Sequence, residues 1–392
     1  MNILFYYAMT YSPLNGGIAN VSLWLANYFV EMGHNVILLS RKPTTKAVSP
    51  LQRYLPNANE QYASENRVAF IEMTKSQQTD VVINQNGITP EETNVLRWCD
   101  ELHIPCCTVL HNSLYGIYNF NDRLGPLIGT FVKWFHLRNI ANKITHFAFR
   151  KKYGRLYRLQ CEKSTKVVLL SNRFRDEYRW FSGCKDEGKM IAIPNCLTIP
   201  VPQMVDINVK RKELLFVGRL AKEKRLDLLI DIWEKLFRVF SDWQLTIVGT
   251  CNKQFEKRVL RLKEKIRKRN IERVVFEGFQ NPAEYYKRAS LFCMTSEYEG
   301  FGLVLIEAMA YGTVPVAFDS YANVSEIITH GKNGMLVPPF RVREYSKTLA
   351  SLMNDPKRRE AMAFSAINTS HNYDVDAICK KWLDLFDSLS AR

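Results

Sequence analysis

The sequence predicts an α/β protein made of two doubly wound domains in tandem, and three observations support this prediction. The chain has 392 residues, more than one hydrophobic core usually serves. Short runs rich in β-branched and aromatic residues alternate with amphipathic segments, which is typical of parallel βαβ units. The alternation stops at the proline-rich stretch PNCLTIPVPQMVD (194–206) and then restarts, so this stretch is the predicted inter-domain connection.

The first series of elements predicts an N-terminal domain over residues 1–200. A helix is expected from about 18 to 32, where Gly33 follows as a helix-stopping residue, and another near 173–181. The predicted strands are 3–9, 35–40, 80–85, 106–112, 166–172 and 190–195. The chain starts with MNILFYYAMTY, which has no basic region and no small-residue cleavage site. This stretch is therefore expected to be a buried first strand and not a signal peptide.

The second series predicts a C-terminal domain over residues 210–372, followed by a last helix at about 374–390. The predicted strands of this domain are 213–220, 243–249, 273–279, 290–296, 314–319 and 334–339. Ligands of doubly wound sheets bind at the carboxyl ends of the strands. We therefore expect the two sheets to face each other across a ligand-binding cleft.

The amino-acid composition limits the possible partners of the protein and indicates its cellular compartment. A formal net charge of +15 favours polyanionic partners such as nucleic acid, anionic membranes or phosphorylated substrates. The nine cysteines are scattered and form no C-x-x-C pair, which predicts buried free thiols in a reducing cytoplasm and neither a disulfide framework nor a zinc site. The longest apolar stretch, 125–137, is too short for a bilayer and contains Lys133, so no membrane span is expected.

The stretch TSEYEGFGLVLIEAMA (295–310) places two carboxylates eight positions apart around a glycine-rich turn. A helix is expected to begin at Gly302 and end at Gly312, with Glu299 in the loop before it and Glu307 inside it. A helix N-terminus behind flexible glycines favours a phosphorylated ligand. Glu299 could instead cap the helix. Because the helix is apolar nearly all round, Glu307 needs a buried partner, which ribose or sugar hydroxyls would supply.

A second motif, GRLAKEK (218–224), follows the first strand of the second series. Arg219 and Lys224 flank the turn after that strand, where the two cations can neutralise a diphosphate leaving group. Solvated surface charge is the alternative, and it is the expected state of Lys222 and Arg225.

EGFGLVLIE resembles the E-x7-E motif of retaining glycosyltransferases, in particular glycosyltransferase family 4, whose members have the GT-B fold. The similarity extends through 308–339 and includes GRLAKEKRLDLLI (218–230). The resemblance implies that two Rossmann-like domains face a cleft, and that the C-terminal helix, about 374–392, crosses back to the N-terminal, acceptor-binding domain.

The resemblance also implies roles for individual residues. Arg219 and Lys224 would bind the donor diphosphate, Glu299 the donor sugar and Glu307 the nucleotide ribose. Other expected donor-binding positions in the second domain are Gly249, Phe279, Gln280 and the backbone of Gly300, Phe301, Gly302 and Leu303.

In the first domain the resemblance implies two further positions. Gly16 and Gly17 in SPLNGGIAN follow the first strand, where the loop would approach the donor phosphate; the alternative is a loose loop, and G-x-G-x-x-G is absent. His111 ends a strand and would orient the sugar, although a lone histidine is more often a structural hydrogen-bonding group.

No metal site and no cofactor other than the nucleotide sugar are expected. The sequence Asp374-Val375-Asp376 resembles the metal-binding D-x-D motif of the other large glycosyltransferase fold. It precedes a predicted helix, however, and aspartates are favourable at helix N-termini, so helix capping is the preferred interpretation.

The segment 123–161 holds nine Lys or Arg residues and no Asp or Glu, with aromatic residues between them. This composition is typical of an amphipathic helix on an anionic membrane surface. A solvated face over a core fits equally well, and single-stranded nucleic acid is ranked third. A second basic run, 257–273, contains acidic residues at helical spacing and is expected to be an exposed helix.

The resemblance implies transfer of a hexosyl unit from a nucleotide diphosphate sugar to an acceptor hydroxyl, with retention of configuration. It also favours a front-face attack, in which the departing diphosphate would accept the proton of the acceptor hydroxyl. A glycan or lipid-linked acceptor at the cytoplasmic face of a membrane is expected. Two alternatives remain. One is a GT-B-like phosphorylase or epimerase, which would be recognised by consumption of free phosphate or water with no acceptor sugar. The other is a non-enzymatic basic scaffold for membranes or nucleic acid.

Overall fold

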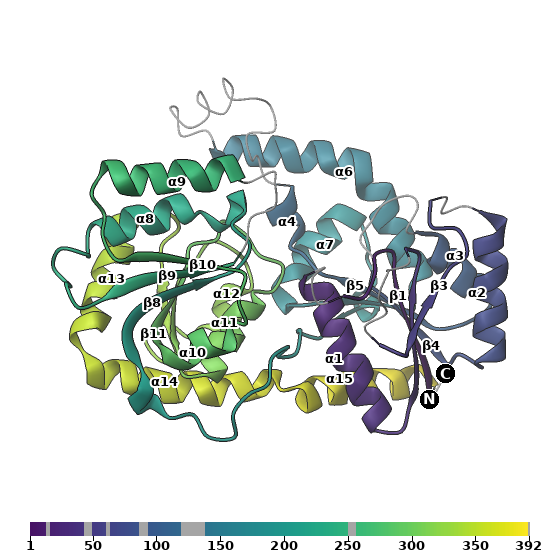
Figure 1. Cartoon of the computed structure of the whole chain (residues 1–392). Helices are drawn as coiled ribbons and strands as arrows, with labels where there is room; N and C mark the ends of the chain where they lie inside the picture. The colour runs from purple at the N-terminus through teal and green to yellow at the C-terminus, as the bar shows by residue number, and fades with distance from the viewer. Residues whose placement is uncertain are drawn as a thin grey trace. The chain divides into compact units, whose positions relative to one another are not determined.

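The computed structural model describes residues 1–12, 16–42, 49–59, 63–85, 93–118, 138–249 and 256–390 (Figure 1). The chain forms two compact units. The N-terminal unit comprises Met1–Cys196 together with Val375–Arg392, and the C-terminal unit comprises Leu197–Asp374. Each unit contains one parallel sheet with helices packed on it, so the predicted α/β class is confirmed.

Seven strands form the sheet of the N-terminal unit in the order β3-β2-β1-β4-β5-β6-β7, and every neighbouring pair is parallel. The strands are β1 Asn2–Tyr7, β2 Asn35–Ser40, β3 Gln52–Tyr54, β4 Val81–Asn84, β5 Cys106–Leu110, β6 Lys166–Leu169 and β7 Met190–Ala192. The helices are α1 Gly17–Glu31, α2 Ser64–Ser76, α3 Asn94–Glu101, α4 Leu114–Ile117, α6 Arg138–Lys163, α7 Arg175–Ser182 and α15 Val375–Ser390.

The last helix of the chain packs on the first helix within the N-terminal unit. The rings of Phe29 on α1 and Phe386 on α15 have centroids 6.0 Å apart, and both side chains are fully buried. The apolar positions of α15 therefore complete the core of a unit whose other elements are all encoded before residue 197.

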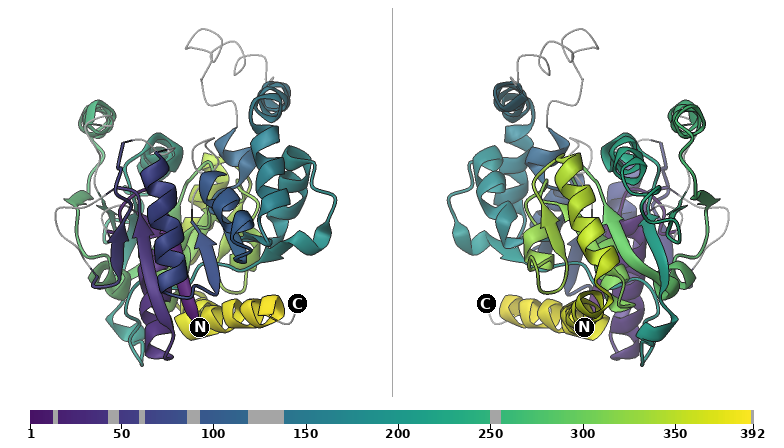
Figure 2. Two further views of the ribbon diagram at one scale, coloured as in Figure 1. Left: turned by 90° about the vertical axis from the view of Figure 1, so that its right-hand side faces the viewer. Right: turned by 90° about the vertical axis from the view of Figure 1, so that its left-hand side faces the viewer.

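Six strands form the sheet of the C-terminal unit in the order β10-β9-β8-β11-β12-β13, again with parallel neighbours. The strands are β8 Arg211–Val217, β9 Gln244–Val248, β10 Val274–Gly278, β11 Ala289–Met294, β12 Val314–Phe318 and β13 Met335–Val337. The helices are α8 Leu226–Glu234, α9 Glu256–Lys268, α10 Ala283–Arg288, α11 Leu303–Ala310, α12 Val324–Ile327, α13 Val342–Asn354 and α14 Pro356–Ser370. Helices cover both faces of this sheet (Figure 2), and its strands β11 and β12 are buried at every residue.

Every predicted strand overlaps a strand of the structure, and one strand was missed. β3 has three residues and pairs only with β2 at the edge of its sheet. Such a short edge strand carries too few residues for a clear hydrophobic pattern. The predicted helix at 173–181 begins as a short 3₁₀ turn, Asn172–Phe174, and continues as α7.

The prediction for the cysteines needs a correction. Cys161 and Cys184 are joined by a disulfide that links the end of α6 to the segment after α7. The remaining described cysteines are free and buried, as predicted; they are Cys99, Cys106, Cys107, Cys196, Cys293 and Cys379. Cys251 and the apolar stretch 125–137 lie outside the described residues. Within the described ranges, none of the helices has both the length and the apolar character needed to cross a bilayer.

Candidate functional site

The topology of the C-terminal sheet marks one position for a ligand. β8 lies between β9 and β11, so the connections that leave β8 and β11 run to opposite sides of the sheet. Ligands of doubly wound sheets bind outside the carboxyl ends of strands at such a switch point. The segments that follow these two strands are 218–225 and 295–302, which contain both motifs identified in the sequence.

Lys224 and Glu299 meet at this switch point. The Nζ of Lys224 donates to Oε1 of Glu299 at 2.5 Å, and each side chain is only 12% exposed. Two further hydrogen bonds hold the loops together: Glu297 N donates to Glu223 O at 2.7 Å, and Thr295 Oγ1 donates to Lys224 O at 2.9 Å. Two residues predicted from separate motifs thus form one largely buried ion pair.

Arg219 lies at the same strand end but in a different environment. Its side chain is 77% exposed, and its nearest acidic partner is Glu223, with Nη2 and Oε1 3.5 Å apart. Arg219 is therefore not part of the Lys224–Glu299 pair, although its long side chain remains free to reorient toward a ligand.

Arg225 corrects the expectation of a simple surface charge. Its side chain is 22% exposed and forms ion pairs with Asp227 at 3.2 Å and with Glu297 at 3.5 Å. The guanidinium carbon also lies 5.4 Å from the centre of the Phe340 ring. Arg225 thus joins its own loop to the 295–302 loop through Glu297 and to α8 through Asp227. Lys222 is exposed, as expected.

The glycine at the end of β9 is required by close backbone packing. Gly249 has a φ of 141°, and its N–H donates to Gly278 O at 2.7 Å. A Cβ at this position would lie 1.9 Å from Gly218 O. The ends of β8, β9 and β10 are therefore pressed together at the predicted ligand edge, and a side chain at Gly249 would force them apart.

The Gly300–Gly302 turn sets the start of α11. Gly302 adopts a φ of 92° and ψ of 45°, directly before the first helical residue, Leu303. Phe301 is buried, its ring packs edge-on against Tyr373 at 5.7 Å, and its carbonyl accepts a hydrogen bond from Asn323 Nδ2 at 2.8 Å. Phe301 therefore anchors the turn through both its side chain and its carbonyl.

Glu307 is buried, as predicted, but it already has partners within the protein. Thr198 Oγ1 donates to Glu307 Oε1 at 2.9 Å, and the Tyr286 hydroxyl donates to Oε2 at 3.0 Å. Burial raises the pKa of Glu307, and the two hydrogen bonds act in the opposite direction. A ligand hydroxyl is therefore not needed to explain the buried carboxylate, and binding of a ribose by Glu307 stays a prediction.

Phe279 and Gln280 follow β10 at the same edge of the sheet. Phe279 is 68% exposed, and Gln280 Nε2 donates weakly to Glu277 O at 3.4 Å. An exposed aromatic ring at the carboxyl end of a strand is available to stack on a planar group.

In the N-terminal unit, His111 pairs with a residue that the sequence did not indicate. His111 Nε2 lies 2.6 Å from Oε1 of Gln85, which follows the neighbouring strand β4. Burial lowers the pKa of His111 to about 3, so the ring is neutral at pH 7. With Nε2 donating to the amide oxygen, Nδ1 is left as an acceptor. The polar residue directly after a buried strand was the available signal for Gln85.

Gly16 and Gly17 stand at the start of α1. Gly16 has a φ of 95°, which is unfavourable for residues with a side chain, and a Cβ there would meet no atom within 4 Å. The glycine is therefore required by backbone conformation and not by crowding. Residues 13–15 of the same loop lie outside the described residues.

A buried carboxylate on α7 was also missed by the sequence interpretation. Glu177 on α7 accepts hydrogen bonds through Oε2 from Ser113 Oγ at 2.9 Å and from Tyr115 N at 3.0 Å. Its Oε1 is buried and has no partner in the described part of the chain. Burial raises the pKa of Glu177 to about 7. Its spacing in α7 gave no signal, because the hydrogen-bonding partners come from the distant α4.

The D-x-D sequence lies at the start of α15. Asp374 precedes α15 and its Oδ2 lies 2.8 Å from Nδ1 of His371, while Asp376 lies in the first turn of the helix. Across the residues for which the structure gives positions, no group of three His, Cys, Asp or Glu side chains could hold a metal ion.

Residues 201–369, which lie within the C-terminal unit, match the family described as glycosyl transferases group 1. The chain is 29% identical over 378 residues to an uncharacterized glycosyltransferase of Haemophilus influenzae, covering 94% of this chain and 95% of that protein. It is 33% identical over 181 residues to the amylovoran biosynthesis glycosyltransferase AmsD of Erwinia amylovora, covering 45% of this chain and 49% of that protein. The predicted resemblance to glycosyltransferases is confirmed.

Two solved structures match nearly the whole chain. A glycosyltransferase from Rickettsia africae superposes with a TM-score of 0.75 at 17% identity, covering 99% of this chain and 98% of that chain. The Anabaena protein Alr3699/HepE, in complex with UDP and glucose, superposes with a TM-score of 0.72 at 17% identity, covering 99% and 100%. At this identity the likeness concerns the fold alone, and it confirms the predicted GT-B architecture.

Proposed function

We propose that this chain, which resembles the group 1 glycosyltransferases and has the GT-B fold, transfers a hexosyl unit from a nucleotide diphosphate sugar to an acceptor hydroxyl with retention of configuration. The observation that carries the proposal is the buried Lys224–Glu299 pair at the switch point of the C-terminal sheet. A pair of opposite charges with little exposure can exchange partners with a ligand that itself offers an anion and hydroxyl groups.

Each member of the pair has a role in the proposed reaction. The donor diphosphate forms an ion pair with the ammonium group of Lys224, while hydroxyls of the sugar donate hydrogen bonds to the carboxylate of Glu299. As the glycosidic C–O bond breaks, negative charge grows on the leaving phosphate oxygen. Lys224 stabilises this charge, and the exposed Arg219 closes onto the diphosphate from the same strand end. The acceptor attacks from the side of the departing diphosphate, which takes up its proton.

The remaining positions support binding of the donor. Glu307 would accept a ribose hydroxyl, Phe279 and Gln280 would line the base, and the Gly300–Leu303 amides would approach the phosphate or sugar. His111 in the N-terminal unit, neutral at pH 7, would orient the sugar by hydrogen bonding and not by proton transfer. We propose that the reaction needs no metal, so added EDTA should leave the rate unchanged.

Kinetics of Lys224→Ala tests the proposal. Loss of a group that stabilises charge in the transition state typically lowers kcat by about 10²–10³-fold. Lys222→Ala is the matched control, because Lys222 lies two residues away in the same turn with an exposed side chain, and it should stay within about 2-fold of wild type. Turnover of donor by Lys224→Ala at the wild-type rate would rule out the proposed role.

The donor and acceptor classes come from the named relatives. UDP and glucose in the Anabaena structure favour a uridine diphosphate hexose, and the amylovoran relative favours a cell-surface polysaccharide or lipid-linked acceptor. A thermal-shift screen against UDP, GDP, ADP and their hexose conjugates tests the donor class, because a ligand stabilises the state that binds it. The largest shift is expected with a uridine nucleotide.

We also propose that the enzyme works at the cytoplasmic face of a membrane, bound through α6. The exposed residues Ile140, Ile144 and Phe147 are spaced i, i+4 and i+7, and are 57%, 64% and 63% exposed. The exposed Lys143 and Lys151 lie on the same face of the helix. Apolar side chains flanked by cations suit the boundary between acyl chains and anionic headgroups. The first part of the basic segment, 123–137, lies outside the described residues.

Vesicle sedimentation tests the membrane proposal. Binding to phosphatidylglycerol vesicles and not to phosphatidylcholine vesicles is expected at low salt. The double substitution Ile144→Ser with Phe147→Ser should weaken binding more than 10-fold, because each side chain loses burial worth about 1.5–3 kcal/mol. Leu260→Ser is the matched control, since Leu260 is 64% exposed on α9, which is also rich in Lys and Arg. An equal loss of vesicle binding in the control would indicate non-specific adsorption of the protein and would contradict a membrane-binding face on α6.

A further inference from the structure

A pocket of about 180 Å³ opens at the edge of the C-terminal sheet opposite to the candidate donor site. Its lining includes Lys210 and Ser290, which lie where β8 and β11 begin, and one face of α14. At about 30 Å³ per water molecule, this volume holds on the order of six waters. The pocket therefore has room for a phosphate group with a short attached chain.

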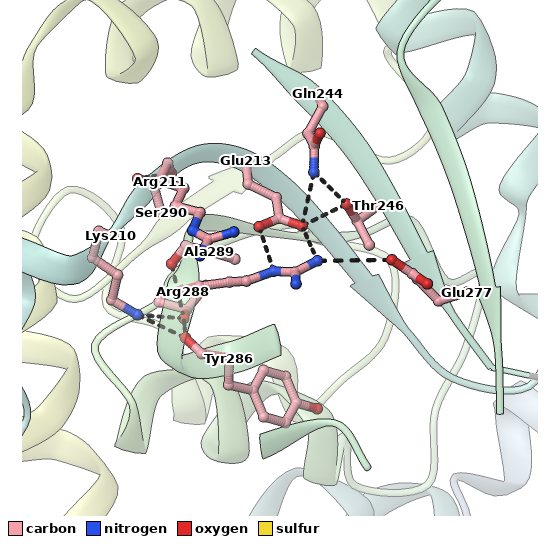
Figure 3. A network of polar contacts seen from close by, with 11 residues as sticks. Lys210, Arg211, Glu213, Gln244, Thr246, Glu277, Tyr286, Arg288, Ala289 and Ser290 are labelled. Atoms are coloured by element: carbon pink, nitrogen blue, oxygen red, sulfur yellow. Dashed lines mark hydrogen bonds and ion pairs between the residues drawn. The ribbon is translucent and has the colours of Figure 1, made fainter. Parts of the chain in front are cut away.

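The first charged group of the pocket is Lys210. Its Nζ donates to Tyr286 O at 2.7 Å and to Thr313 Oγ1 at 2.9 Å (Figure 3). An ammonium group has three N–H bonds, so one donor is left for a ligand. Among the described residues, no carboxylate lies within ion-pair distance of Lys210. Desolvation lowers the pKa of Lys210 to about 7, which is the expected response to a buried cation without a counter-ion.

The second charged group is Arg359 on α14. Its Nη1 donates to the carbonyls of Leu352 and Met353, the latter at 2.9 Å, and its guanidinium carbon lies 5.2 Å from the centre of the Trp243 ring. Burial lowers the pKa of Arg359, and the negative charge of Asp355, which makes no ion pair with it, acts in the opposite direction. In the part of the chain that the structure describes, Arg359 also has no ion pair with a carboxylate, and its Nε and Nη2 make no hydrogen bond.

A nearby arginine in the same unit is a cation that does have a carboxylate partner. Arg288 donates from Nε and Nη2 to the two carboxylate oxygens of Glu213, at 3.0 and 3.1 Å, and Glu213 is almost completely buried (Figure 3). Glu213 also tends to raise the pKa of Lys210, but this carboxylate is already neutralised by Arg288. Lys210 and Arg359 thus lack the compensation that Arg288 has.

The charge balance of the pocket is positive. Its charged lining residues are Lys210, Arg359 and the exposed Glu360, so two cations stand against one carboxylate on the rim. Asn208, which is exposed and also lines the pocket, adds a neutral donor. A dianionic phosphate would accept from the third N–H of Lys210 and from the unused face of the Arg359 guanidinium.

We propose that this pocket is a binding site for a phosphate group, either inorganic phosphate or a small phosphomonoester, held by Lys210 and Arg359. The site is separate from the donor-binding edge, because Lys210 precedes β8 and Lys224 follows it. The proposal does not depend on the proposed glycosyl transfer.

Isothermal titration calorimetry on the full chain tests the site. The background is Lys224→Ala, so that the donor edge contributes no phosphate binding, and the probes are inorganic phosphate and glucose 6-phosphate with chloride at matched ionic strength. Millimolar or tighter binding of a phosphate probe is expected, with no comparable response to chloride. A preference for glucose 6-phosphate would identify a phosphomonoester ligand, and equal affinities would identify the phosphate group itself as the recognised species.

Three substitutions then locate the binding. Lys210→Met should weaken it at least 10-fold, whereas Lys212→Met should leave it unchanged, because Lys212 pairs with Asp242 on the surface. Glu360→Gln, at an exposed position that cannot endanger the fold, should strengthen binding about 2- to 3-fold by removing the negative charge at the rim. Two results would overturn the proposal. One is the absence of phosphate binding up to roughly 10 mM, and the other is a phosphate affinity that neither Lys210→Met nor Glu360→Gln changes.

Discussion

Lys210 and Lys224 stand at opposite ends of the same strand, β8, and the protein surrounds them differently. Lys224, after the carboxyl end, pairs with the carboxylate of Glu299 at 2.5 Å. Lys210, before the amino end, is held by a carbonyl and a hydroxyl and has no carboxylate partner in the described chain. The difference teaches that the donor edge is neutral before a ligand arrives, whereas the opposite edge keeps an uncompensated cation. Exchange of partners is expected at the first edge and capture of an anion at the second.

The largest expected effect comes from breaking the pair at Lys224. Glu299→Ala should lower kcat/KM about 10³-fold, or roughly 4 kcal/mol, because the sugar loses its acceptor and Lys224 loses the group that positions it. Glu299→Gln keeps an oxygen for Lys224 and should retain more activity than the alanine variant. The measurement is steady-state kinetics with the donor identified by thermal shift.

Glu297→Ala is the matched control for this prediction. Glu297 belongs to the same loop but pairs with Arg225 at 3.5 Å and not with Lys224. A loss in Glu297→Ala as large as that in Glu299→Ala would mean that loop structure, and not the Lys224–Glu299 pair, governs the rate.

A smaller effect is expected from the pH dependence of stability at Lys210. Its pKa is lowered from 10.5 to about 7 by burial, so the unfolded chain binds more protons than the folded chain between these values. The free energy of unfolding must then rise with pH over this interval, and the penalty for burying the ammonium is fully present below pH 7. From pH 7 to pH 9 the gain is about 2 kcal/mol.

The gain is measured as the difference between wild type and Lys210→Met, in phosphate-free buffer, by denaturant unfolding monitored in the C-terminal unit. Wild type should become more stable relative to the variant as the pH rises, since methionine has no proton to lose. Parallel pH profiles would show that Lys210 is solvated and would weaken the contrast with Lys224.

Patterns local in sequence predicted much of the fold and part of the site. The alternation of apolar runs and amphipathic segments identified all strands except β3, whose three residues at a sheet edge carry no clear pattern. The paired glutamates and the GRLAKEK turn correctly indicated the residues that follow β8 and β11. Their pairing in space depends on the strand order, in which β8 and β11 are neighbours although 71 residues separate Lys224 from Thr295, whose hydrogen bond joins the loops.

What the sequence could not show were partners supplied from distant segments. Gln85 beside His111, and Thr198 and Tyr286 on Glu307, are common residue types at positions without a motif. The 161–184 disulfide joins two cysteines from a scattered set, whose pairing cannot be deduced from spacing. Side-chain contacts of this kind are fixed by tertiary packing, and hydrophobic periodicity carries no information about them.

The smallest predicted effect concerns Glu307, where a structural role and a ligand-binding role can be separated. Tyr286 links the two edges of the sheet, because its carbonyl accepts from Lys210 and its hydroxyl donates to Glu307. Burial raises the pKa of Glu307, so the neutral Glu307→Gln should fold with a melting temperature equal to wild type or higher. If a ribose hydroxyl donates to Glu307, the loss of a charged acceptor should weaken UDP binding by about 1 kcal/mol, or roughly 5-fold.

Calorimetric titration of UDP into wild type and Glu307→Gln distinguishes the two roles. A weaker affinity with unchanged thermal stability assigns the carboxylate to the ligand, whereas unchanged affinity assigns it to Thr198 and Tyr286 alone. Thr198→Ala is the companion variant, since it removes one donor to the carboxylate and leaves the charge in place. It should lower stability by about 1 kcal/mol and leave UDP binding unchanged, because the remaining carboxylate oxygen can still accept from a ribose.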